Sequence, residues 1–182
     1  MFGFFNRRPD APFEPFVGVG TVFLSDVRNL SAPSEGFDPA QLAKAITIHL
    51  SHVENAILKH RGRVLQHLGD AVLAFWPPEI PSHAQLAYEA ARTAICTLPK
   101  SLQKQSGLKY SLQIALGTSE MAGDFFGPTR QFQIIGKARA IVERMTSVNI
   151  SNKSCILFSQ YTREVIRTKD TVEEIEIGRA HV

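Results

Sequence analysis

One stretch of the sequence decides the fold: RVLQHLGDAVLAFW, residues 63–76. Its two apolar halves meet at residues 68–70, and a Gly-Asp step between two apolar runs is typical of a β-hairpin. Pro77 and Pro78 end the second strand, because proline has no backbone N–H to donate to a sheet. A helical pattern lies on each side, so we expect this hairpin to sit at the centre of a larger unit.

The flanking segments supply the other elements of that unit. Apolar residues before the hairpin recur with a helical period: Leu42, Ile46, Leu50, Val53 and Ile57. After the hairpin, an alanine-rich segment that Ser82 could cap predicts a second helix over residues 82–98. Residues 17–24 and 110–116 have the composition of strands. The order β-α-β-β-α-β indicates a ferredoxin-like α+β core, with helices covering one face of an antiparallel sheet.

The remaining residues extend this core or precede it. Strands are predicted at residues 131–135, 154–158 and 172–177, and helices at residues 138–148 and 160–167. The fold is therefore expected to be a ferredoxin-like βαββαβ core with an added C-terminal β-α-β extension. We interpret residues 1–15 as an N-terminal tail or arm and residues 16–182 as a single domain.

Composition narrows the class of protein. The chain has 182 residues, is 44% hydrophobic and carries a net charge of +3, too little for a nucleic-acid-binding patch. No apolar run approaches the ~20 residues that span a bilayer. The opening MFGFFNRRPD has its aromatic residues before its basic ones, the wrong order for a signal peptide. We expect a cytoplasmic protein without a membrane span.

Two aspartates stand at the edges of apolar strands. Asp26 follows VFLS and Asp70 follows VLQHLG. The first strand neighbours the hairpin in a β-α-β-β-α-β sheet, so the two carboxylates can converge, and they would repel each other unless a cation lay between them. Mg²⁺ prefers such oxygen ligands. The alternative is that Asp26 caps a helix or turn and that Asp70 merely occupies the hairpin turn.

The residues after Asp26 suggest what a metal would serve. Val27, Arg28, Asn29 and Leu30 lead into a loop and a helix, where backbone N–H groups can face an anion. Two cations, Mg²⁺ or Mn²⁺, beside a phosphate site favour phosphoryl chemistry, because one activates the attacking oxygen and the other stabilises the leaving one.

From about residue 17 to residue 182, the sequence resembles the class III nucleotidyl cyclases, the family of adenylate and guanylate cyclases. Five segments resemble family motifs in the family's order: VFLSDVRNLS, RGRVLQHLGDAVLAFW, HAQLAYEAARTA, LQIALGTSEM and FQIIGKARAIVERM. The first resembles VLFADIRGFT and the second GGTLDKFIGDAVMAVF. The resemblance implies the class III cyclase homology fold and metal ligands at Asp26 and Asp70.

The departures from the family concern the base and the transition state. By resemblance, Gln66 and Gln133 stand at the base-recognition positions, where the family carries Lys and Asp or Thr. Ala140 replaces a transition-state Asn, whereas Arg144 matches the family's catalytic Arg. Two glutamines can donate to or accept from either edge of a base. A triphosphate-binding Lys is expected just beyond the last residues, EIEIGRAHV.

The resemblance implies a phosphorus–oxygen lyase that makes a 3′,5′-cyclic nucleotide second messenger and pyrophosphate from a nucleoside triphosphate. It also implies a head-to-tail homodimer, with the metal site on one subunit and Arg144, Gln66 and Gln133 across the interface. Altered purine-reading positions resemble the bacterial pyrimidine cyclases of antiphage defence, which make cyclic UMP or cyclic CMP from UTP or CTP. The alternatives are a purine cyclase and a catalytically inactive dimerisation or nucleotide-sensing module; Ala140 favours the last, and the paired carboxylates oppose it.

Overall fold

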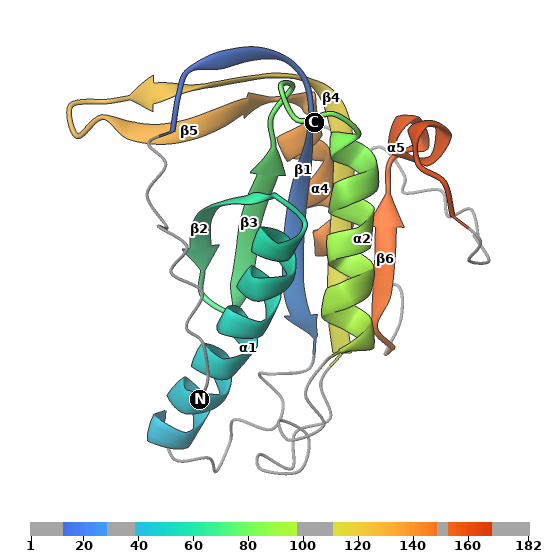
Figure 1. Cartoon of the computed structure of the whole chain (residues 1–182). Helices are drawn as coiled ribbons and strands as arrows, with labels where there is room; N and C mark the ends of the chain where they lie inside the picture. The colour runs from blue at the N-terminus through green and yellow to red at the C-terminus, as the bar shows by residue number, and fades with distance from the viewer. Residues whose placement is uncertain (1–12, 29–38, 98–110, 149–152, 169–182) are drawn as a thin grey trace, which may run out of the picture.

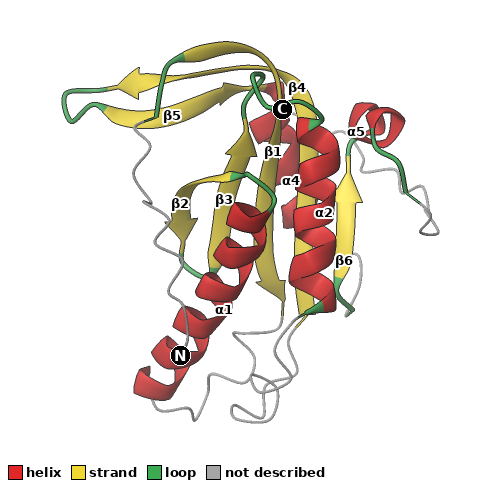
Figure 2. Ribbon diagram, viewed as in Figure 1, coloured by secondary structure: helices red, strands yellow, loops and turns green. Residues whose placement is uncertain are grey.

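The computed structural model describes residues 13–28, 39–97, 111–148 and 153–168 (Figure 1). Its elements are β1 (Phe16–Arg28), α1 (Pro39–Lys59), β2 (Arg63–Leu68), β3 (Ala71–Trp76), α2 (His83–Cys96), β4 (Ser111–Phe126), β5 (Gln131–Gly136), α4 (Lys137–Ser147), β6 (Cys155–Phe158) and α5 (Gln160–Val165). Figure 2 shows the helices packed against one large sheet.

The sheet has the strand order β2-β3-β1-β4-β5, and β6 pairs with β4. β1 lies between β3 and β4 and is antiparallel to both, as the ferredoxin-like core requires. β6 runs parallel to β4, so the complete sheet is mixed. The α+β fold, with its central hairpin and C-terminal extension, is therefore confirmed. The strand predicted at residues 172–177 lies outside the described residues.

Both faces of the sheet are covered. Side chains of a strand alternate between its faces, and in β1 Phe23 points to the core under α1 and α2. Val22 and Leu24 point to the other face, where Val142 of α4 covers them. Figure 1 shows α1 and α2 in front of the sheet and α4 behind it. The prediction of helices over one face holds for α1 and α2, and the extension adds α4 to the opposite face.

Two strands are longer than their apolar patterns predict. β4 was expected to end at Leu116 but continues to Phe126, because β1 and β5 pair with its second half. The polar residue Thr118 is fully part of this ladder and lies opposite Thr21. Ser82 occupies the N-cap position of α2, but its side chain makes no capping hydrogen bond, contrary to the predicted role.

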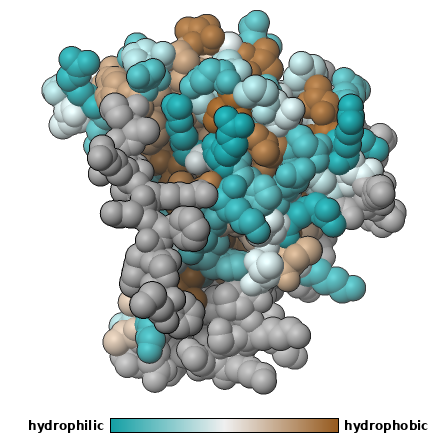
Figure 3. All heavy atoms as spheres, in the orientation of Figure 1, coloured by the Kyte–Doolittle hydropathy of each residue, from teal (hydrophilic) through white to brown (hydrophobic). Residues whose placement is uncertain are grey.

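An aromatic cluster folds the β4–β5 hairpin back over the sheet. The ring of Phe132 in β5 lies 6.0 Å from that of Phe75 in β3 and 4.6 Å from that of Phe13. β5 therefore packs over β3 although β1 and β4 separate the two in the sheet order. Over α1 and α2 the surface is mostly hydrophilic (Figure 3). Among the described residues, no helix is both long and apolar enough to cross a membrane.

Candidate metal and nucleotide site

Asp26 lies within β1, on the face of the sheet that α4 covers. Its cross-strand partner in β4 is Gln113, and its side chain is 29% exposed. The sequence suggested that the strand ends at this carboxylate. The strand instead continues to Arg28, because Val27 and Arg28 still pair with β4. Asp26 is thus held on a rigid element rather than in a turn.

Asp70 occupies the turn between β2 and β3, directly before Ala71. The antiparallel register of β1 and β3 pairs Ser25 with Val72, so Asp26, one position after Ser25, and Asp70, two positions before Val72, lie at the same end of the two strands. The negative charge of Asp70 acts on Asp26 and raises its pKa. The two carboxylates therefore lie near enough to interact electrostatically, and their joint role as metal ligands stays a prediction.

The environment of Asp26 disfavours its ionised form. Burial is the largest influence and raises the pKa of Asp26 above its ordinary value. The Arg28 guanidinium lowers it, Asp70 raises it again, and the backbone N–H of Val27 lowers it by hydrogen bonding. The net effect is a raised pKa of Asp26. An additional cation beside this carboxylate would therefore stabilise its ionised form.

The pair fits a divalent cation that also binds a substrate. Carboxylate oxygens are the ligands that Mg²⁺ and Mn²⁺ prefer, and Mg²⁺ is commonly held by one or two carboxylates plus substrate phosphates. Within the described ranges, no group of three or more His, Cys, Asp or Glu side chains could hold a metal ion without further ligands. Water molecules or oxygen atoms of a substrate would therefore complete the coordination shell beside the two aspartates.

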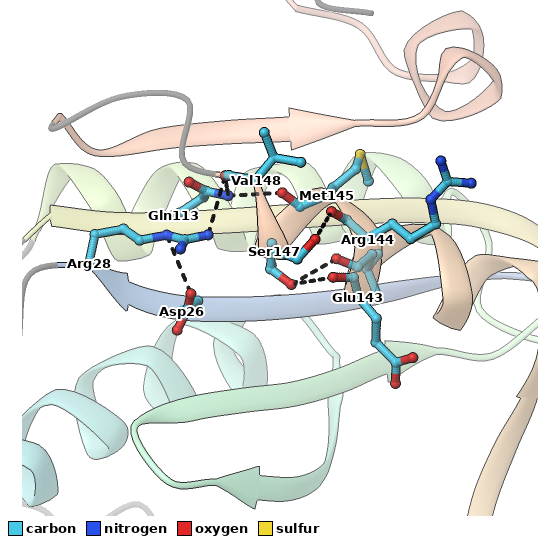
Figure 4. A network of polar contacts seen from close by, with 10 residues as sticks. Asp26, Arg28, Gln113, Glu143, Arg144, Met145, Ser147 and Val148 are labelled. Carbon is cyan, nitrogen blue, oxygen red and sulfur yellow. Dashed lines mark hydrogen bonds and ion pairs between the residues drawn. The ribbon is translucent and has the colours of Figure 1, made fainter. Parts of the chain in front are cut away.

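Arg28 lies on the same face of β1 as Asp26. Its Nε atom is 3.4 Å from Oδ2 of Asp26, and its Nη2 atom donates to the backbone carbonyl of Val148, also at 3.4 Å. The guanidinium therefore joins the carboxylate to the end of α4. This contact is visible in Figure 4.

The predicted phosphate-binding segment is described only in part. Val27 and Arg28 belong to β1 and lie opposite Leu112 and Ser111 of β4. Asn29 and Leu30 lie outside the described residues. The use of these backbone amides to hold phosphates stays a prediction.

The two predicted base-recognition residues stand on different strands. Gln66 is exposed on β2 and lies opposite Leu73, a member of the core under α4, so it shares the face of Asp26. Gln133 is half-buried on β5, between Phe132 and Ile134, which both point into that core. By strand alternation Gln133 faces the other way. Their joint role in base recognition stays a prediction.

Arg144 lies on α4 and is exposed, as is Ala140 one turn earlier. Figure 4 shows the Arg144 side chain pointing away from Asp26. A single chain therefore does not bring this guanidinium to the carboxylates that it is expected to serve. This arrangement is what the predicted dimeric site requires, because Arg144 would then act on the partner's nucleotide.

One residue of the site was missed by sequence reasoning. Gln113 is 1% exposed and donates to two carbonyls at the end of α4, Met145 at 3.0 Å and Val148 at 3.1 Å. The available signal was a glutamine within the apolar run LQIAL, since buried polar groups usually have a specific hydrogen-bonding task.

The fold is similar to those of solved nucleotide cyclases. The adenylyl cyclase CyaB from P. aeruginosa is 24% identical, with a TM-score of 0.71 over 84% of this chain and 82% of its own. The guanylyl cyclase Cya2 is 18% identical, with a TM-score of 0.75 over 89% and 85% of the two chains. The guanylate cyclase domain of RhGC from Catenaria anguillulae, solved in complex with GTP, is 19% identical, with a TM-score of 0.72 over 84% of each chain.

No protein-family model and no curated protein sequence matches the chain. Its likeness to the solved cyclases therefore lies in the three-dimensional arrangement of the elements. The chain has the class III cyclase homology domain fold.

Proposed function

We propose that this chain is a nucleotidyl cyclase, which converts a nucleoside triphosphate into the 3′,5′-cyclic nucleotide and pyrophosphate. The observation that carries the proposal is the approach of Asp26 and Asp70 at one end of β1 and β3, in a fold that adenylyl and guanylyl cyclases share. Two ionised carboxylates at close range are costly unless a cation compensates them, so their pairing supports a metal-binding role.

In this reaction the ribose 3′-oxygen attacks the α-phosphorus, the bond to the β-phosphate oxygen breaks, and pyrophosphate leaves. Divalent cations would supply the acidification of the 3′-hydroxyl and the neutralisation of the leaving group. Asp26 and Asp70 would hold these cations and so orient the polyphosphate. The backbone amides of residues 27–30 bind the terminal phosphates.

Arg144 stabilises the charge that develops on the α-phosphate, a task that suits a guanidinium. Because Arg144 points away from Asp26 on its own chain, it serves the site of a second copy. The active species is therefore a head-to-tail homodimer with two sites at its interface. A monomer is inactive in this scheme.

The base is a pyrimidine in our proposal, with UTP or CTP as substrate and antiphage signalling as a role. Gln66 is exposed on the face that carries Asp26, and an amide there reads a base through one donor and one acceptor. A glutamine carries no charge that would select one purine edge. A purine substrate is the alternative outcome of the same experiment.

One observation favours a catalytically inactive nucleotide-sensing module instead. Ala140 is exposed on α4, one turn before Arg144, and has no side-chain donor for a transition state. Loss of one such donor typically costs 10²–10³-fold in kcat rather than all activity. We therefore favour a slow cyclase over an inactive one.

The experiment offers ATP, GTP, CTP and UTP separately to the purified chain with Mn²⁺ and measures cyclic product by mass spectrometry. A cyclic nucleotide from one of them, lost in Asp70→Asn, is expected. Nucleotide-dependent stabilisation without product from any of the four would establish the sensing module. Glu164→Gln, at an exposed position on α5, is a control that should retain activity.

A further inference from the structure

The end of α4 is held by a side chain of the sheet. Gln113 of β4 is buried, and its Nε2 atom donates to the carbonyls of Met145 and Val148 at 3.0 and 3.1 Å. The last carbonyls of a helix have no partner within the helix, so an external donor stabilises this turn. Both donors of the Gln113 amide are used in this way.

The backbone carbonyl of Val148 also accepts a hydrogen bond from Arg28, which in turn contacts Asp26. Nη2 of Arg28 donates to Val148 O at 3.4 Å, while Nε of Arg28 lies 3.4 Å from Asp26 Oδ2. Asp26 and Gln113 are themselves cross-strand neighbours. Figure 4 shows the resulting continuous series of polar contacts from the carboxylate to the last turn of α4.

Arg144 belongs to that last turn. Its carbonyl accepts a hydrogen bond from Ser147 Oγ at 2.8 Å, and the next residue, Met145, is held by Gln113. The Oε1 atom of Gln113 is buried and has no hydrogen-bond partner among the described residues. Burying an unsatisfied acceptor is costly, so this glutamine is better explained by the carbonyls that it holds than by packing.

We propose that Gln113 and Arg28 are positioning residues that set the place of Arg144, and so link the two active sites of the dimer. This inference rests on the proposed cyclase function. Asp26 serves the site of its own chain, whereas Arg144 serves the partner's site. A network that joins Asp26 to the Arg144 turn therefore makes the geometry of one site depend on the other.

Mixed dimers separate the two sites. Asp70→Asn on one chain and Arg144→Ala on the other leave a single intact site, which combines the carboxylates of the second chain with Arg144 of the first. Random mixing makes half of the dimers mixed, each with one of two sites intact, so about one quarter of wild-type activity is expected. No activity in this mixture, with an active wild type, would overturn the shared site and the inference with it.

Gln113→Met is then added to either chain. On the Asp70→Asn chain, which supplies Arg144, it should lower kcat of the surviving site about tenfold or more with little change in KM, because Arg144 acts on the transition state. On the Arg144→Ala chain the loss should be smaller. Equal losses on the two chains, or no loss, would overturn the positioning role while leaving the cyclase function intact.

Arg28→Lys tests the bridge itself. Lysine keeps the positive charge beside Asp26, but a single ammonium cannot replace the two separate nitrogen contacts of the guanidinium. On the Asp70→Asn chain, which keeps Asp26, both Arg28→Lys and Arg28→Met should therefore lower kcat of the site that this chain's Arg144 serves. Wild-type kcat in Arg28→Lys would show that charge alone is needed and would exclude the bridge.

A matched control and a readout other than activity complete the test. Gln85→Met removes another amide tether, between α2 and the backbone of Arg167, remote from α4, so its effect should not depend on which chain carries it. Hydrogen exchange on folded Gln113→Met should be faster at the amides of residues 145–148 than in wild type. Unchanged exchange there would contradict the proposed tether.

Discussion

Nε of Arg28 lies 3.4 Å from Oδ2 of Asp26, two positions away on the same face of β1. This neighbour gives Asp26 a positive charge of its own, which lowers a pKa that burial and Asp70 raise. A divalent cation at Asp26 would share the carboxylate with that guanidinium. The local ion pair and the proposed metal site therefore compete.

Removing this competitor should strengthen metal binding. Arg28→Met is expected to bind Mn²⁺ on the order of fivefold more tightly at pH 8, since one nearby positive charge is lost. The melting temperature as a function of Mn²⁺ concentration, without nucleotide, measures this affinity. Arg63→Met, which breaks the ion pair with Glu79 on another part of the surface, is the control. Weaker Mn²⁺ binding by Arg28→Met than by wild type would contradict the proposed competition between Arg28 and the metal for Asp26.

Asp26 should destabilise the metal-free fold. Folding raises the pKa of Asp26, so the folded state favours the protonated carboxyl. The free energy of unfolding therefore decreases as the pH rises above the ordinary pKa of the group. Asp26→Asn is therefore expected to be more stable than wild type at pH 8 with chelator, by about 1 kcal/mol or less. Saturating Mn²⁺ should stabilise the wild type but not Asp26→Asn. A lower melting temperature of Asp26→Asn than of wild type, at pH 8 with chelator, would contradict this prediction.

His49 should make the fold acid-sensitive. It is 3% exposed in α1, and burial, with a smaller effect of His52, lowers its pKa from 6.5 to about 4. Between these values the unfolded chain binds the proton and the folded chain does not, so stability falls as pH falls, by about 3 kcal/mol in total. His49→Leu should lose less stability than wild type between pH 7 and pH 4. Urea unfolding at each pH measures the slope; Thr47→Ala, at an exposed position of the same helix that carries no titratable group, should keep the wild-type slope.

Gly117 allows α4 to approach β4. A Cβ atom at this position would lie 2.7 Å from the carbonyl oxygen of Ala138 and 3.1 Å from Val142, so the helix would have to move. Gly117→Ala is expected to destabilise the protein by about 1–3 kcal/mol, as overpacking of a core usually does. Denaturant unfolding measures this change. Ser119→Ala, two residues along the same strand, should stay near wild type.

Much of the fold could be predicted because its elements carry their own patterns. The period of α1 and the turn at Gly69 are local signals, and together they define the core around the hairpin. The second half of β4 carried no such signal, since its sequence GTSEMAGDFF alternates poorly and pairing with β1 and β5 holds it in place. Tertiary pairing decided that strand.

Some positions of the candidate site could be singled out from the sequence, and their roles stay predictions. Asp26 and Asp70 stand out because acids follow apolar strands, and the strand order brings them together. The tether made by Gln113 was not predictable, because its acceptors are backbone carbonyls 32 and 35 positions away along the chain. Only the packing of α4 on β4 reveals it.

Anomalous scattering from crystals grown with Mn²⁺ and a non-cyclising triphosphate analogue of the productive nucleotide tests the central claim most directly. The account predicts Mn²⁺ peaks bonded to the carboxylates of both Asp26 and Asp70 and to phosphate oxygens, with the partner subunit's Arg144 facing the α-phosphate. Mn²⁺ bound to the phosphates alone, with Asp26 still paired only to Arg28, would contradict it.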